Sequence, residues 1–158
     1  MHKEFITRSE TGFFSNLSIQ LVEGQESLKP LIHQPFSKES LIQQANLKKS
    51  SFTLEKRKLL YNSLDEHKMN IDQKKVKENQ ELLLEDNTLT ITTGHQLNLY
   101  TGPLYVVYKI MHVIKLAEEM NSEDPDNNYI PLFWMATEDH DFEEINHFHL
   151  FNDTITWE

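Results

Sequence analysis

The chain has 158 residues, enough for one domain, or for one small domain and part of another. Its formal net charge is -10 at pH 7, which argues against a nucleic-acid surface because clustered Lys and Arg carry phosphate binding. The absence of cysteine excludes disulfides, a thiolate metal site and a cysteine nucleophile.

The sequence also gives no sign of a membrane segment. No apolar run approaches the roughly 20 residues needed to cross a bilayer. The start of the chain, Met1–Glu4, is polar and is not followed by the apolar run of a signal peptide. We therefore expect a cytoplasmic protein that contacts neither membrane nor nucleic acid.

Residues 1–85 are predicted to form a mostly helical N-terminal segment. Residues 13–21 fit either a short strand or a helix. Ser37 precedes an amphipathic stretch that predicts a helix to about Leu47. From Thr53 onward, leucines recur at helical steps among many charged residues, which also favours helix.

Strand, helix and strand follow in that order. The alternation in 88–93 predicts a strand, and the helix begins at Pro103, with Gly102 as its N-cap, and runs to about Met120. This helix is apolar around most of its circumference, so we expect cover on more than one side. The apolar run at 129–136 is typical of a strand buried on both faces of a parallel sheet. The fold class is therefore α/β with a parallel sheet.

Parallel strands place the loops at their carboxyl ends on one edge of the sheet, where open α/β folds bind ligands. The first such loop is Gly94–Gly102, which holds two of the four glycines in the chain. Glycines are used where the backbone turns tightly or approaches another group, and a helix N-terminus favours an anion. An ordinary connection between strand and helix explains the loop equally well.

The second loop is Glu138–Asp141, part of a cluster of carboxylates and imidazoles that extends to residue 149. Three interpretations stay open: a general acid/base pair, a divalent-metal site, or a solvated acidic loop. His147 and His149 alternate with apolar residues, so we expect them on the surface of a strand. Residues 154–157 begin another strand pattern, in which the chain stops, as expected of an incomplete domain.

Four blocks of this sequence together resemble a known family. The blocks are Thr92–Gln96, Thr101–Tyr105, Tyr108–Lys109 and Phe133–His147. They are similar to the cysteine-adding enzymes of bacillithiol biosynthesis, the BshC family of cysteine ligases. The resemblance covers all 158 residues, but family members are longer, so it implies an N-terminal portion. Residues 86–158 would then be the first part of a Rossmann-like core, incomplete here.

The resemblance implies a ligase that adds L-cysteine to glucosaminyl-malate, the last step in making bacillithiol. It also implies homodimers of the full-length chain, and carboxylate activation through ATP or another nucleotide, although no cofactor is fixed by the sequence. From chemistry, we assign an acid/base role to the second loop and a phosphate- or carboxylate-binding role to the first. The catalytic candidates are Glu138, Asp139, His140 and Asp141, and the binding candidates are Thr93, Gly94, His95, Gln96, Thr101 and Gly102.

Two other functions fit the same residues. One is a metal-dependent hydrolase that uses the acidic and histidine cluster at 138–149. The other is a non-catalytic fragment that binds a partner. No four-ligand metal site is evident from the spacing, so no residue is predicted as a metal ligand.

Overall fold

The computed structural model describes residues 4–66, 74–139 and 141–158. The chain divides into two compact units, Met1–Leu47 and Lys48–Glu158. The domain boundary predicted between residues 85 and 86 stays a prediction.

The first unit is helical, as predicted. Residues 13–21, which fitted either a strand or a helix, contain most of a helix. The Ser37 hydroxyl accepts a hydrogen bond from the Ser40 backbone N–H at 3.2 Å, which satisfies one of the free amides at the start of the predicted helix. The elements are α1 (Arg8–Thr11), α2 (Asn16–Val22), the 3-10 helix η1 (Glu26–Leu31) and α3 (Lys38–Lys49), whose last two residues belong to the second unit.

The second unit begins with two helices, α4 (Leu54–Glu66) and α5 (Lys74–Leu82). Arg57 on α4 is 2% exposed and connects this helix to the segment that leads into the sheet. Its guanidinium donates to the backbone oxygens of Thr88 at 2.7 Å, Asp86 at 2.9 Å and Phe52 at 3.1 Å. Burial lowers the pKa of Arg57, yet at neutral pH the side chain stays charged.

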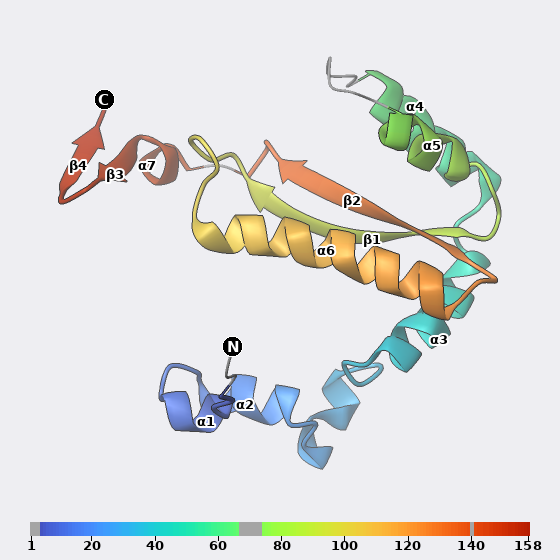
Figure 1. The fold of residues 1–158 in the computed structure, drawn as a ribbon, viewed down its shortest axis with the longest axis horizontal. Helices are drawn as coiled ribbons and strands as arrows, with labels where there is room; N and C mark the ends of the chain where they lie inside the picture. The colour runs from blue at the N-terminus through green and yellow to red at the C-terminus, as the bar shows by residue number, and fades with distance from the viewer. Residues whose placement is uncertain (1–3, 67–73, 140) are drawn as a thin grey trace. The chain divides into compact units, whose positions relative to one another are not determined.

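The predicted strand, helix and strand are confirmed. They are β1 (Thr88–Gln96), α6 (Leu104–Glu123) and β2 (Asn128–Ala136). The two strands are adjacent and parallel, from Thr88 opposite Asn128 to Gln96 opposite Ala136, and α6 packs against both (Figure 1). The fold class is therefore α/β, with a parallel strand pair preceded by a helical segment.

The packed core lies toward the amino ends of β1 and β2. Its members are apolar side chains of both strands, of α6 and of the residue after α5. They are Leu83, Leu89, Val113, Ala117, Met120, Tyr129 and Ile130.

A buried polar network closes this end of the sheet. The Asp124 carboxylate accepts the Tyr129 hydroxyl at 2.6 Å and the Asn127 side-chain amide at 2.7 Å. These two hydrogen bonds lower the pKa of Asp124. Burial and the bond to Asp124 raise the pKa of Tyr129. Asn121 on α6 pairs with both the N–H and the C=O of Tyr129, so the start of β2 is tied to the end of the helix.

Two boundaries differ from the sequence prediction. β1 continues to Gln96, so Gly94 and His95 lie in the strand and not in the loop. The strand is longer because the register with β2 is unbroken to Ala136. At the helix, Pro103 and not Gly102 is the N-cap, with an extended backbone at φ -60° and ψ 148°.

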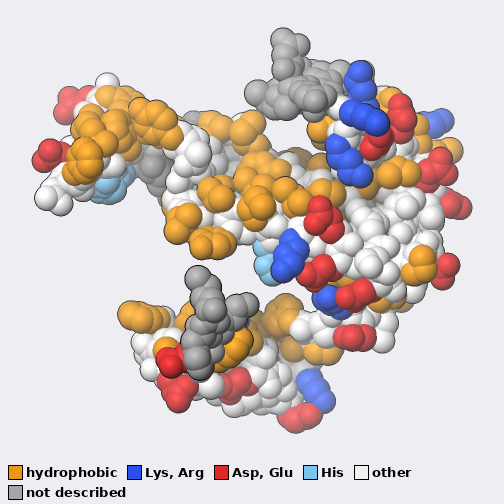
Figure 2. Space-filling model, viewed as in Figure 1, with side chains coloured by type: hydrophobic (Ala, Val, Ile, Leu, Met, Phe, Trp, Pro, Cys, Tyr) orange, Lys and Arg blue, Asp and Glu red, His pale blue; other side chains and the backbone are white. Residues whose placement is uncertain are grey.

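The predicted burial of β2 and α6 was wrong for part of each. Only the first half of β2 is buried, and Phe133, Trp134 and Met135 are between 39% and 58% exposed. On α6, Leu104 and Met111 are also exposed. Within the described ranges the sheet of β1 has only β2 as a second strand, and these two strands are the main packing partners of α6, so large parts of β2 and α6 stay uncovered. Figure 2 shows hydrophobic side chains gathered on the surface over β2 and α6.

Beyond the carboxyl ends of β1 and β2, the chain forms α7 (Phe142–Ile145) and a hairpin of β3 (His147–Leu150) and β4 (Asp153–Thr156) (Figure 1). The strands predicted around His147, His149 and residues 154–157 are therefore confirmed. In the part of the chain that the structure describes, no helix is both long and apolar enough to cross a bilayer.

Candidate functional site

The carboxyl edge of the strand pair is the candidate site. Gln96 and Ala136 are register partners at the ends of β1 and β2. The loops that begin at Leu97 and Thr137 therefore leave the sheet from the same edge, as predicted. In open parallel sheets this edge is where ligands bind.

Local structure explains why glycine occupies both positions, 94 and 102, in the region of the first loop. A Cβ on Gly94 would lie 2.7 Å from the Trp134 backbone oxygen, so the glycine permits close approach of β2. Gly102 has φ +66°, and a Cβ there would lie 2.8 Å from Cγ of Asn98. Tyr100 also has a positive φ, 55°, so the loop turns tightly before α6.

His95 is half-buried and held at both ring nitrogens. Its Nδ1 lies 2.8 Å from the Asn98 amide nitrogen, and its Nε2 lies 2.6 Å from the Tyr105 hydroxyl on α6. The same Asn98 nitrogen donates to the backbone oxygen of Gln96 at 2.9 Å. The hydrogen-bonded series Asn98–His95–Tyr105 thus joins the loop, the strand and the first turn of the helix.

Lys109 supplies a cation beside this hydrogen-bonded series. Its Nζ donates to the Gly94 backbone oxygen at 2.6 Å and lies 5.9 Å from the Tyr105 ring centroid. Tyr105 and Lys109 are four residues apart on one face of α6, so they lie side by side.

Two cavities flank α6. The first, which we call the donor groove, has a volume of about 370 Å³ and lies between α6 and β1. Its polar lining consists of Thr92, Thr93, Tyr105, Tyr108, Lys109 and His112. The second, of about 320 Å³, is mostly apolar and is lined by the loop, by α6 and by Phe133 and Met135 of β2. The binding candidates are divided between them: Thr93 lines the donor groove, and Gln96 and Thr101 line the second cavity.

Local structure explains part of the second loop, Glu138–Asp141, which we call the acidic loop. Glu138 and Asp139 are exposed in the turn after β2. Asp141 is the N-cap of α7, and its carboxylate accepts the Glu143 N–H at 3.1 Å. His140 lies outside the described residues. Among the residues that the structure describes, no three His, Asp or Glu side chains are grouped so that they could hold a metal ion.

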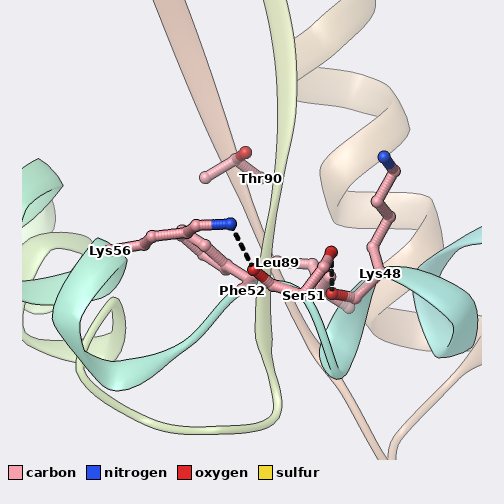
Figure 3. A pocket seen from close by; sticks show the side chains of 6 residues that line it. All are labelled: Lys48, Ser51, Phe52, Lys56, Leu89 and Thr90. Carbon is pink, nitrogen blue, oxygen red and sulfur yellow. Dashed lines mark hydrogen bonds between the residues drawn. The ribbon is translucent and has the colours of Figure 1, made fainter.

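A further hollow of about 380 Å³ lies near the start of β1 (Figure 3). Lys48, Ser51, Phe52 and Lys56 line it, together with Leu89 and Thr90 of β1. The Lys56 ammonium donates to the Ser51 backbone oxygen at 2.8 Å, so this side chain is tied to the wall. None of the residues predicted as site residues lines this hollow.

Sequence reasoning did not include Asn98, Tyr105 or Lys109 among the site residues. The four-residue spacing of Tyr105 and Lys109 indicates a shared helix face, which is a usable signal. No local pattern relates His95 to Tyr105, because their contact depends on the path of the intervening loop.

A parallel β–α–β unit with polar loops at its carboxyl edge defines an α/β protein of the Rossmann-like class. The family described as "Bacillithiol biosynthesis BshC, N-terminal Rossmann-like domain" matches residues 1–158. The chain therefore belongs to the BshC family.

Individual relatives agree with this assignment. The chain is similar to proteins named "Putative cysteine ligase BshC" from three bacteria. Identity is 42% over 99% of the chain for Flavobacterium johnsoniae, 40% over 99% for Flavobacterium psychrophilum and 39% over 92% for Cytophaga hutchinsonii. The chain spans between 28% and 30% of the length of these relatives.

Proposed function

We propose that the chain forms the N-terminal part of a ligase that joins L-cysteine to glucosaminyl-malate, the last step in bacillithiol synthesis. The observation that carries this proposal is the family match over residues 1–158, with relatives named as cysteine ligases. We place the reaction in the cytoplasm, with small molecules as substrates and the full-length chain as a homodimer.

Amide formation from a carboxylate sets two chemical requirements. One carboxylate oxygen must become a leaving group, for which we propose activation by a nucleotide such as ATP. The attacking amine must lose a proton. The two loops at the carboxyl edge offer groups for both tasks, because one carries hydrogen-bond donors and the other carries carboxylates.

In this proposal the acidic loop provides the base. His140 takes the proton from the amine, and Asp139 or Asp141 orients the imidazole, as carboxylates commonly do. Glu138 completes the acidic group. Thr93 of β1, Gly102 of the first loop and the N-terminus of α6 bind phosphate or carboxylate oxygens.

The test is ligation by a full-length protein that carries this segment, with bacillithiol measured by mass spectrometry. His140→Ala and Asp141→Asn are each expected to lower the rate by on the order of 100-fold, the scale of a general acid/base contribution. Asn is the informative replacement at position 141 because it caps a helix as well as Asp does. Asp153→Asn, an exposed carboxylate at the start of β4, is the matched control.

Two results would count against the proposal. Full activity of the His140→Ala protein would remove the acid/base role of the loop. Metal that co-purifies in stoichiometric amount, or unfolding by a chelator, would favour the metal-dependent hydrolase instead.

A further inference from the structure

The contacts of Asn98 fix the orientation of its side-chain amide. One atom of this amide lies 2.9 Å from the Gln96 backbone oxygen, which can only accept a hydrogen bond. That atom must therefore be the nitrogen, because the amide oxygen in its place would face another acceptor. The nitrogen has a second hydrogen, and this points to Nδ1 of His95 at 2.8 Å.

The amide orientation in turn fixes the tautomer of His95. Nδ1 must accept from Asn98, so it has no hydrogen, and the neutral ring carries its proton on Nε2. If Nδ1 carried the proton, it would donate to the Gln96 oxygen at 3.1 Å. The Nδ1–H group and the Asn98 amide N–H, both donors, would then face each other. With the proton on Nε2, each hydrogen of the Asn98 amide has an acceptor, while Nδ1 lies 3.1 Å from the Gln96 oxygen, which is a second acceptor.

The tautomer decides what Tyr105 can do. Nε2–H donates to the Tyr105 oxygen at 2.6 Å, so the hydroxyl hydrogen of Tyr105 is left to point elsewhere. Tyr105 is 53% exposed and lines the donor groove, which places this hydrogen where a ligand can reach it. The Lys109 ammonium has three hydrogens, one of which goes to Gly94, so it adds a positive charge with donors to spare.

We propose that Tyr105 is a ligand-contacting residue that donates a hydrogen bond to an oxyanion in the donor groove, with His95 and Asn98 as its positioning residues. The oxyanion is a carboxylate or a phosphate. The polar lining of the groove comprises four hydroxyls, one ammonium and one imidazole, which are the groups that bind such oxygens. Because it names the ligand group for the site of the proposed ligase, this inference rests on the proposed function.

The first measurement locates the proton on His95. In the 15N-labelled protein, long-range 1H–15N correlation spectra distinguish a proton on Nε2 from one on Nδ1. We expect the Nε2–H form in the unmodified chain and a mixture of tautomers in Asn98→Ala. A dominant Nδ1–H form in the unmodified chain would overturn the proposal.

The second measurement is binding of two separate probes, inorganic phosphate and L-malate, followed by the same spectra. Binding of phosphate assigns the groove to a nucleotide, and binding of L-malate assigns it to a carboxylate substrate. Tyr105→Phe is expected to weaken binding by about tenfold or more, as for a lost hydrogen bond to a charged group. Tyr61→Phe removes the same hydroxyl from α4, outside the groove, and is expected to leave binding unchanged.

The positioning role has its own test. His95→Ala is expected to weaken binding as much as Tyr105→Phe, whereas His95→Gln is expected to restore most of it because the Gln amide can donate from near the Nε2 position. Binding of neither probe, or unchanged binding in Tyr105→Phe, would overturn the inference. No ligation step enters these measurements. A protein that binds through Tyr105 but forms no bacillithiol would therefore contradict the proposed function alone.

Discussion

At the scale of single residues, the second unit depends on a few buried polar side chains with several partners each. Arg57 and Asp124 are both almost fully buried, and each joins segments that are separate in the chain. A buried polar group of this kind is costly to disturb, because its partners lose their hydrogen bonds and stay out of water.

Arg57→Met is expected to lower the free energy of unfolding by about 3 kcal/mol, since buried carbonyls left without a donor cost about 1–3 kcal/mol each. The Met side chain fills part of the space but cannot donate to Thr88 or Asp86. Urea denaturation measures the change. Lys58→Met on the exposed face of α4 is the control, and an equal effect of the two variants would contradict the proposed role of Arg57.

Asp124 is expected to make the protein sensitive to acid. Its pKa is lowered in the folded chain, so its contribution to stability is complete above the ordinary value of 3.8 and is lost as the pH falls through the lowered pKa. Asp124→Asn should therefore be less stable at pH 7 and should lose less stability between pH about 5 and 2. Denaturation at several pH values tests this, with the exposed Asp126→Asn as control. Parallel pH curves for Asp124→Asn and the unmodified chain would be the contrary result.

At the scale of elements, the pairing of β1 with β2 depends on Gly94. The strand needs a residue without a side chain here, because a Cβ would meet the Trp134 backbone oxygen at 2.7 Å. This requirement belongs to the fold of the strand pair, in addition to any part that Gly94 has in ligand binding.

Gly94→Ala is expected to destabilise the second unit by about 1–3 kcal/mol, the usual cost of forcing extra volume into a packed site. Hydrogen exchange should show faster exchange of the amides that join the carboxyl halves of the two strands. Thr92→Ala, which removes volume two residues earlier on the same strand, is the control. Unchanged exchange in Gly94→Ala would mean that β2 can move away at no cost.

The elements themselves were predictable because their signals are local. The signals are the alternation in 88–93, the helical spacing after Pro103 and the turn before Tyr129. Each can be recognised within about ten residues, and together they predict the order strand, helix, strand that gives the parallel pair. The exposure of Trp134 was not predictable in this way, because the extent to which a side chain is buried depends on which elements lie nearby. The same holds for Tyr105, which reaches His95 only because the loop turns through two residues with positive φ.

At the scale of the whole molecule, the second unit leaves much apolar surface uncovered. The exposed side chains on α6 include Leu104, Val107, Met111 and Ile114, and β2 adds Trp134. Contiguous apolar surface and open strand edges both promote association between proteins.

The 158-residue chain is accordingly expected to self-associate as its concentration rises. Met111→Glu should shift it toward the monomer in size-exclusion chromatography with light scattering, because it places a charge in the apolar face of α6. Lys115→Gln changes the net charge by the same amount and leaves that face intact, so it should associate like the unmodified chain. A chain that stays monomeric throughout would contradict the expectation.

The close contact between Gly102 and Asn98 makes the neighbouring positions 95, 98 and 102 interdependent in any redesign. A methyl group at 102 would displace the amide of Asn98, since the added carbon would lie 2.8 Å from its Cγ. The proton on the imidazole of His95 could then move to the other nitrogen, although no atom of the ring had been altered. Substitutions at 95, 98 and 102 should therefore be non-additive, and a loop grafted onto another sheet would have to carry all three, together with Tyr105, to keep its chemistry.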